Sequence, residues 1–200
     1  MRAFLKTEKR NQREKIIDAA VDLFERKGYK ATTIREIGRN AGVNPGHLYY
    51  YFEKKSQILL EVYKRAISRV LDRQKAVSGQ GSNEIDTIKS FINEHLKNYL
   101  IDDRSYLAVF LREYKWLPPS DAKFAKRAAY KYRKVVEGLI NQGIEKKAFE
   151  NLNPTVVTFI LLGMLNWTLF WFDPKGPVSL EEVMETCSAI FFDGIRKKGT

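Results

Sequence analysis

The stretch Thr32–Lys55 restricts the fold more than any other part of the chain, because it contains two helix starts in quick succession. At the first start, Thr33 and Glu36 form the S/T-x-x-E pattern of a capping box, which predicts a helix beginning at Ile34. Apolar residues three and four positions apart then give this helix one apolar face.

Gly42 and Asn44 mark the end of this predicted helix and the beginning of the next. Glycine adopts the left-handed conformation that ends many helices without steric cost. Asn44 is a favoured N-cap residue, and Pro45 at the first helical position predicts a second helix at once. Two helices joined by a short turn with glycine are typical of a helix-turn-helix. A preceding helix over residues 8–28 would complete a small three-helix bundle.

The rest of the chain shows helical periodicity only. A long helix is expected from about Lys54 to Ala76, and residues 78–83 are a linker rich in glycine and serine. Asn153 and Ser179 are N-cap signals for the last two helices. The sequence therefore predicts an all-α protein of about nine helices, with a helix-turn-helix domain at residues 1–53 and a second helical domain at residues 54–200.

The charge distribution favours a polyanionic partner, most simply nucleic acid. The net charge is +11, and residues 1–55 alone carry thirteen Lys and Arg against seven Asp and Glu. A generally basic protein with a solvated surface remains the alternative. The single cysteine, Cys187, excludes an intrachain disulfide and a cysteine-rich metal site and suits a reducing cytoplasm. The basic N-terminus has no following apolar segment, so we expect no signal peptide. We also expect a cytoplasmic protein without a metal or a cofactor.

Several residues of the predicted turn and second helix suit contacts with DNA. Asn44 and His47 can hydrogen-bond to base edges, and Gly46 lets the backbone approach a duplex closely. Tyrosine hydroxyls and lysine ammonium groups follow these residues in the sequence. Two threonines precede the helix that begins at Ile34, where the free N–H groups of a helix N-terminus favour phosphate. The further candidates are Thr32, Thr33, Tyr49, Tyr50, Tyr51, Lys54 and Lys55. Each has an ordinary structural explanation, such as a helix cap for Thr33, and at least one tyrosine should pack in the core.

In order, these residues resemble the DNA-binding domain of the TetR family of bacterial transcriptional repressors. The family pattern runs from F-x-x-x-G-(Y/F) through T-T-x-x-x-I-A-x-x-A-G-V-S-x-G-x-L-Y-x-Y-F to a following lysine. The matching residues are Phe24, Gly28, Tyr29, Thr32, Thr33, Ile37, Ala41, Gly42, Val43, Gly46, Leu48, Tyr49, Tyr51, Phe52 and Lys55. Gly38 and Asn44 stand where the family usually has alanine and often has serine. These differences leave the operator sequence open.

The resemblance implies a homodimer that binds a palindromic operator in double-stranded DNA. By that resemblance Thr33, Tyr49 and Lys55 would hold phosphates. The residues facing the major groove would be Asn44, Pro45, Gly46, His47 and Tyr50. Loss of a phosphate-holding Lys55 should weaken binding to every sequence and lower the salt slope by about one.

The run from Val156 to Phe172 is the most apolar part of the chain. Its length is at the lower limit for a membrane span, and Asn166 and two threonines interrupt it. We therefore expect a buried helix of a bundle and no membrane association. A helix that is apolar on nearly all sides must be covered on all sides. A dimer interface shared with the last helix is expected, in agreement with the resembled family.

Aromatic and basic residues gather in the second domain and suggest a pocket for an amphiphilic anion such as a fatty acyl-CoA. The candidate residues are Tyr99, Tyr106, Phe110, Arg112, Tyr114, Trp116, Arg133, Trp167 and Trp171. A packed aromatic core is the alternative. The segments FLREYKWLPP and YRKVVEGLINQGIEKKAF also look similar to the fatty-acid-degradation subgroup of the family.

These observations favour a ligand-responsive repressor, released from its operator by an effector. The alternatives are a repressor that responds to another hydrophobic molecule and a DNA-binding protein without an effector. An enzyme is disfavoured, because the chain has no glycine-rich phosphate loop, no metal-ligand cluster and no plausible triad.

Overall fold

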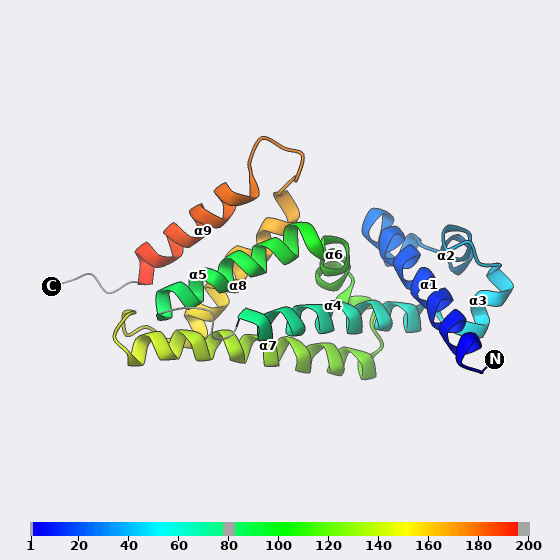
Figure 1. Cartoon of the computed structure of the whole chain (residues 1–200), viewed down its shortest axis with the longest axis horizontal. Coiled ribbons are helices and arrows are strands. Elements are labelled where there is room, and N and C mark those ends of the chain that lie inside the picture. Colours follow the sequence, from blue (N-terminus) through cyan, green and yellow to red (C-terminus); the bar gives the residue numbers. More distant parts are fainter. Residues whose placement is uncertain (1, 78–82, 196–200) are drawn as a thin grey trace. The chain divides into compact units, whose positions relative to one another are not determined.

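The computed structural model describes residues 2–77 and 83–195, where the regular elements are all helices (Figure 1), which confirms the predicted all-α class. The α-helices in these ranges are α1 (Arg2–Ala31), α2 (Ile34–Asn40), α3 (Pro45–Tyr51), α4 (Lys55–Val77), α5 (Glu84–Lys97), α6 (Arg104–Arg112), α7 (Pro119–Glu145), α8 (Pro154–Trp171) and α9 (Leu180–Ile195). A π-helix, η1 (Asn98–Asp102), directly follows α5, and a 3₁₀-helix, η2 (Tyr114–Trp116), precedes α7. The predicted linker at residues 78–83 lies outside the described residues except for its last position, Asn83, which caps α5.

The chain packs as two compact units that interleave along the sequence. The first comprises residues 1–67 and 105–126, and the second comprises residues 68–104 and 127–200. The division falls inside α4 and α7, so each of these helices contributes residues to both units. The first unit thus combines the helix-turn-helix with α6 and η2. A functional boundary between residues 53 and 54 stays a prediction.

The start and end of α2 in the first unit follow the predicted caps. Thr33 and Glu36 form a reciprocal capping box, in which Thr33 N–H donates to Glu36 Oε2 at 2.8 Å and Glu36 N–H donates to Thr33 Oγ1 at 3.2 Å. Gly42 ends the helix with φ 65°. Gly28, with φ 82°, breaks α1 near its end, as the predicted stop at residue 28 requires. The three N-terminal helices therefore form the expected helix-turn-helix, with α2 in contact with both α1 and α3.

The first half of α4 is held within the first unit by buried polar contacts. Tyr63 is fully buried, its hydroxyl donates to the carbonyl oxygen of Phe110 at 2.6 Å, and the two rings lie 4.9 Å apart. Arg65 pairs with Glu14 of α1 at 3.0 Å and with Asp18 at 3.6 Å, and it donates to the Tyr106 hydroxyl at 3.3 Å. The Tyr106 hydroxyl in turn donates to Asp18 at 2.5 Å. These contacts join α4 to α1 and α6.

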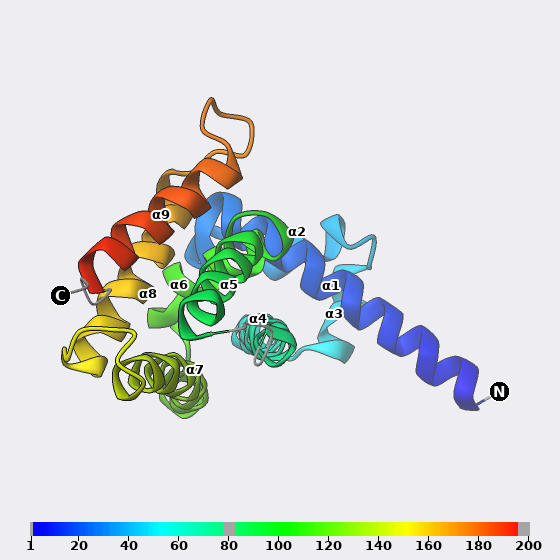
Figure 2. The same cartoon turned by 60° about the vertical axis from the view of Figure 1, so that its left-hand side comes forward.

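The second unit has one apolar core, built from α5, the second half of α7, α8 and α9. Its fully buried members include Ile88, Ile92, Leu96, Val136, Leu161 and Leu165. The predicted N-caps are confirmed, because Asn153 Oδ1 accepts from Thr155 N–H at 3.0 Å and Ser179 Oγ accepts from Glu182 N–H at 3.1 Å. Figure 2 shows α9 alongside α8, with which it is in contact.

The second half of α4 is tied to the end of η1 by an ionic cluster within the second unit. Arg69 pairs at 2.5 Å with Asp103, whose side chain is almost fully buried. Arg73 pairs with Asp102 at 2.6 Å and with the other oxygen of Asp103 at 3.4 Å. Because the Asp103 carboxylate is buried, losing its arginines would leave a buried charge uncompensated.

Helix α8 buries one face and exposes an apolar one. Val157, Leu161 and Leu165 lie in the core of the second unit. The exposed apolar residues on the other face are Val156, Phe159, Ile160, Trp167, Phe170 and Trp171. Among the described residues, α8 is also the one helix whose length and composition would allow it to cross a bilayer. A core helix of a soluble bundle has the same composition, and α8 does pack in a core.

Candidate DNA-binding surface and effector pocket

Helix α3 presents aromatic and polar side chains from a firmly anchored backbone. Leu48 and Phe52 are buried in the first unit and fix its inner face. Tyr49 and Tyr50 are 53% and 65% exposed, and His47 is exposed as well. The His47 ring stacks on Tyr50, with centroids 5.8 Å apart, so these two side chains support each other. Large exposed aromatic side chains on a short, rigid helix are a surface suited to contacts with a partner.

The first turn of α3 is preorganised by its cap. Asn44 Oδ1 accepts a hydrogen bond from Gly46 N–H at 2.9 Å, so this side chain caps the helix while its amide group stays exposed. A Cβ atom at Gly46 would lie 3.3 Å from Asn44 Oδ1, a tight contact that glycine avoids. The side chain of Pro45 lies outside the described residues.

Thr32 and Thr33, both predicted near phosphate, lie in different surroundings. Thr32 is buried, and its hydroxyl donates to the carbonyl oxygen of Gly28 at 2.9 Å. Thr33 is exposed as the N-cap of α2, and its hydroxyl donates to Glu36. Lys27 also contacts Glu36, and these hydrogen bonds hold the pKa of Glu36 at about 2, well below its ordinary value. Thr32 therefore stabilises the turn, and Thr33 remains accessible to a ligand.

Lys55 has intramolecular partners that the sequence did not indicate. Its ammonium group donates to the carbonyl oxygens of Tyr29 and Thr32, each at 2.6 Å, and lies 4.3 Å from the centroid of the Tyr29 ring. Burial lowers the pKa of Lys55. In this structure Lys55 satisfies carbonyl groups at the end of α1, and its contact with phosphate stays a prediction.

Replacing Lys55 with methionine is expected to lower the free energy of unfolding by about 1–2 kcal/mol, because charge-assisted hydrogen bonds to carbonyl groups are lost. Lys54 is exposed, and the same substitution there should change stability little. Urea unfolding of both variants measures the difference. Equal stability of the two variants would contradict the structural role, whereas a lower salt slope in DNA binding would support the phosphate role.

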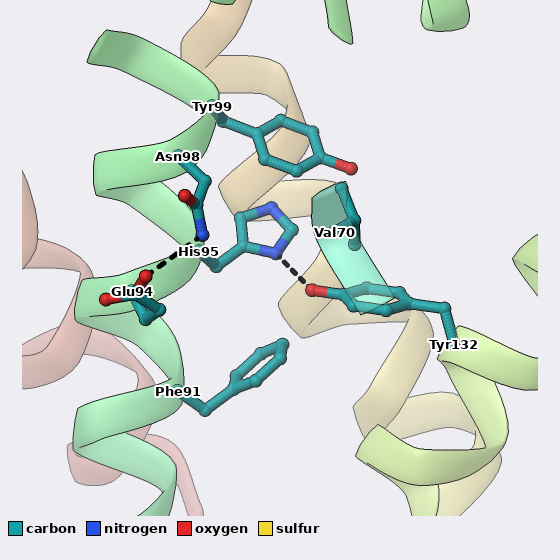
Figure 3. Close-up of a pocket in the computed structure, with 7 residues that line it drawn as sticks. All are labelled: Val70, Phe91, Glu94, His95, Asn98, Tyr99 and Tyr132. Atoms are coloured by element: carbon teal, nitrogen blue, oxygen red, sulfur yellow. Dashed lines mark hydrogen bonds between the residues drawn. The ribbon is translucent and has the colours of Figure 1, made fainter. Parts of the chain in front are cut away.

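The second unit contains a small cavity of about 20 Å³ (Figure 3). Its lining residues come from α4, α5, η1 and α7 and are Val70, Phe91, Glu94, His95, Asn98, Tyr99 and Tyr132. His95, Asn98 and Tyr99 share one face because they are three and four positions apart. The space holds about one water-sized group.

His95 is the centre of a buried hydrogen-bond chain. Its Nε2 lies 3.2 Å from Asn166 Oδ1 and its Nδ1 lies 2.7 Å from the Tyr132 hydroxyl. The amide oxygen only accepts, so Nε2 carries the proton and the Tyr132 hydroxyl donates to Nδ1. The Tyr99 ring stacks on the imidazole with centroids 4.0 Å apart. Burial lowers the pKa of His95 to about 3, which keeps the ring neutral at physiological pH.

Stability should fall as the pH drops below about 6.5, because the unfolded state then protonates His95 while the folded state does not. The loss continues down to about pH 3, the pKa of the folded state. Between pH 6.5 and 5 most carboxylates stay charged, so His95 contributes most clearly there. Urea unfolding of the wild type and of His95→Gln as a function of pH measures this effect. A shallower slope is expected for the variant, and parallel profiles would contradict it.

The predicted effector residues are divided between the two units. Those in the first unit are Tyr106, Phe110, Arg112, Tyr114 and Trp116, and those in the second are Tyr99, Arg133, Trp167 and Trp171. Of the nine, only Tyr99 lines the cavity. Trp167 and Trp171 lie on the exposed face of α8, and Arg133 lies over the exposed Phe159 ring at 4.8 Å. A role in effector binding stays a prediction for all nine.

The sequence analysis missed most residues of the cavity. The polar residues that it did not select are Glu94, His95, Asn98 and Tyr132. The sequence does contain a signal for two of them. His95 and Asn98 occupy positions of the apolar stripe that runs along α5 and its continuation, and a polar residue at such a buried position needs a hydrogen-bond partner. No sequence pattern indicated the π-helix η1, which carries the lining residues Asn98 and Tyr99. Short π-helical segments often occur at functional sites.

Comparisons with known proteins agree with this arrangement. Residues 16–62 match the family model described as bacterial regulatory proteins, tetR family. Residues 81–195, more than half of the chain, match the model of the tetracyclin repressor-like C-terminal domain.

Two curated relatives span nearly the whole chain. The HTH-type transcriptional repressor KstR2 of Rhodococcus jostii is 23% identical, over 94% of this chain and 92% of the repressor. The fatty acid metabolism regulator protein of Bacillus subtilis is 23% identical, over 96% of this chain and 99% of that protein.

Solved structures show the same fold. KstR2 of Mycobacterium tuberculosis, described as a ketosteroid transcriptional regulator, has a TM-score of 0.84 at 22% identity, covering 93% of this chain and 95% of its own. AibR, in complex with isovaleryl coenzyme A and operator DNA, has a TM-score of 0.84 at 20% identity, covering 90% and 97%. Together with the helix-turn-helix at its N-terminus, the match over most of its length shows that the chain belongs to the TetR family of bacterial transcriptional regulators.

Proposed function

We propose that this protein is a transcriptional repressor that binds a palindromic operator as a homodimer and is released by an amphiphilic effector, most simply a fatty acyl-CoA. The observation that carries the proposal is the combination, in one chain, of an exposed aromatic helix after a capped turn with a second helical unit that contains a small cavity. The first suits DNA, and the second suits a small ligand.

For DNA, the proposal assigns α3 as the recognition helix. Its exposed residues His47, Tyr49 and Tyr50 would meet base edges and phosphates, with Asn44 and Gly46 at its first turn. Thr33 at the start of α2 remains exposed for a phosphate. The positive charge of residues 1–55 supplies the sequence-independent attraction.

For the homodimer, the proposal uses the exposed apolar face of α8. Ile160 and Trp167 are 63% and 65% exposed, and Ile190 of α9 is 63% exposed. Soluble proteins rarely leave an apolar face of this extent exposed, and such faces usually mark a contact with a partner. A twofold contact between copies covers the same face on both chains and places two recognition helices on two half-sites.

The acyl-CoA assignment draws on the relatives. The B. subtilis relative is named for fatty acid metabolism, and AibR was solved with isovaleryl coenzyme A. In this chain, α7 carries a basic run that would suit the phosphates of coenzyme A, including Lys123, Lys126, Arg127 and Lys131. A second candidate is a steroid-type ligand, which the description of KstR2 favours.

Effector binding would reach DNA through α4. Its second half lines the cavity with Val70 and holds Arg73, which lies 3.9 Å from the lining residue Glu94. Its first half belongs to the first unit and begins at Lys55. A ligand that displaces the second half of α4 would therefore also displace its first half, which begins directly after the recognition helix α3.

Fluorescence anisotropy tests the proposal with a labelled operator obtained by selection from random duplexes. Adding decanoyl-CoA or palmitoyl-CoA should release the DNA, whereas free coenzyme A at the same concentration should not. Stable complexes at high micromolar concentrations of both thioesters would exclude this effector class. Release by a steroid thioester alone would favour the second candidate.

A further inference from the structure

The start of α2 carries a cluster of polar and charged side chains around the Glu36 carboxylate. Glu36 Oε2 accepts hydrogen bonds from both the N–H and the hydroxyl of Thr33, each at 2.8 Å. Glu36 Oε1 accepts from the ammonium group of Lys27, which directly precedes the break of α1 at Gly28. The hydrogen bonds from Lys27 and Thr33 hold the pKa of Glu36 at about 2, so this carboxylate is negative at neutral pH.

Two of the side chains that were expected to hold phosphate already have their donors in use. Thr33 gives both its N–H and its hydroxyl proton to the carboxylate. Lys55 donates to the carbonyl oxygens of Tyr29 and Thr32 at 2.6 Å and to that of Lys30 at 3.4 Å, which uses the three N–H groups of an ammonium. Either residue would have to give up an internal hydrogen bond before it could bind a phosphate.

Lys27 has donors to spare. Among the described residues, its one hydrogen-bond partner is Glu36, whereas an ammonium group carries three N–H groups. Its side chain is 34% exposed, so the remaining donors can reach a ligand in solvent. A phosphate that approached this cluster would otherwise meet the Glu36 carboxylate, and a cation between the two anions makes the contact favourable.

The cluster lies close to the recognition helix. Burial has the largest effect on the pKa of Lys55, which it lowers, and the charges of Glu36 and Lys27 also affect this pKa, so the three residues are neighbours. Lys55 begins α4, a short step after the end of α3. In a helix-turn-helix, the first helix crosses the DNA backbone while the second lies in the major groove. The cluster therefore occupies the start of the helix that crosses the backbone.

We propose that Lys27 is a phosphate contact of the DNA-binding surface and that Glu36 positions its ammonium group for this contact. The ammonium would bridge the carboxylate and one backbone phosphate through separate N–H groups. This inference rests on the proposed DNA-binding function, and it adds a contact that fixes the protein on the duplex without reading sequence.

Anisotropy titrations over a range of salt concentrations, on the selected operator and on an unrelated duplex, test the assignment. Lys27→Gln should weaken binding to both duplexes by about tenfold at about 0.1 M salt and lower the salt slope by about one, because each phosphate contact contributes about 0.9 to that slope. Lys27→Arg should restore most of both. Glu36→Gln should instead tighten binding to both duplexes by about threefold, within the range of an exposed ion pair. Glutamine also serves in a capping box, so α2 should stay capped.

Lys30→Gln is the matched control. Lys30 is an exposed lysine of the same helix, but its ammonium group lies over the Trp116 ring at 5.0 Å, and its loss should leave the salt slope unchanged. Urea unfolding shows that the variants are folded.

The outcomes separate this contact from the proposed function. A purely structural ion pair would make Lys27→Gln and Glu36→Gln equally less stable and leave the salt slope as in the wild type, and this result would overturn the assignment. An equal loss of affinity in Lys30→Gln would overturn it as well, because net charge alone would then explain the effect. If selection yields no operator, a lower slope for Lys27→Gln on the unrelated duplex still supports the contact, while sequence-specific repression fails.

Discussion

Replacing His47 and Tyr50 together with alanine is expected to weaken binding to the selected operator by about 10²–10⁴-fold, since each good base contact contributes about 1–3 kcal/mol of discrimination. Both side chains are exposed on α3 and stack on each other. Their removal opens no cavity, so the variant should unfold at the wild-type urea concentration. Binding to non-operator DNA should change little, because that affinity depends on phosphate contacts.

The two single variants make this prediction sharper. Because the two rings are in contact, their effects on affinity should not add, and a double-mutant cycle measures the coupling. Tyr130→Ala is the matched control, since Tyr130 is as exposed as Tyr49 but belongs to α7. A double variant that binds the operator as tightly as the wild type would show that α3 does not read the DNA.

Replacing Trp167 with glutamate is expected to convert the protein to a monomer and to weaken operator binding by about 10²–10⁴-fold, the range that linkage of two binding modules contributes. Trp167 lies on the exposed apolar face of α8, 65% exposed in the single chain. A carboxylate there would be buried without a partner in a twofold interface, at a cost of several kcal/mol. Analytical ultracentrifugation gives the association state, and anisotropy gives the affinity.

Phe124→Glu is the matched control for the dimer. It introduces the same charge at another exposed aromatic residue, 42% exposed on α7, and should leave the dimer intact. The helical content of both variants should equal that of the wild type. A dimeric Trp167→Glu protein would contradict the α8 interface and leave the dimer contact to other surfaces.

Local signals explain why most helix boundaries could be predicted. The capping box at Thr33 and the Asn-Pro starts at Asn44 and Asn153 depend only on residues within a few positions, and all three appear as expected. Gly28 and Gly42 adopt the positive φ expected of helix-ending residues. The π-helix at residues 98–102 could not be predicted, because no local sequence signal distinguishes it from the end of α5.

The surroundings of the candidate binding residues depend on contacts between distant segments, which the sequence indicates less well. The partners of Lys55 lie at the end of α1, more than twenty positions away. His95 meets Tyr132 of α7 and Asn166 of α8, and no spacing rule links these three residues. Density of aromatic residues predicted a pocket, but Trp167 and Trp171 lie on an exposed face instead. Helical periodicity identifies an apolar stripe without saying which partner covers it.

Selection of bound duplexes from a random-sequence library tests the central claim most directly. The full-length protein is mixed with the library at moderate salt, and bound fragments are sequenced over successive rounds. Two copies of α3 related by twofold symmetry should enrich an inverted repeat whose half-sites are spaced by about one helical turn or a multiple of it. Trp167→Glu should lose this enrichment. Bound fragments that share no sequence, or a single site without symmetry, would contradict a dimeric operator-binding repressor.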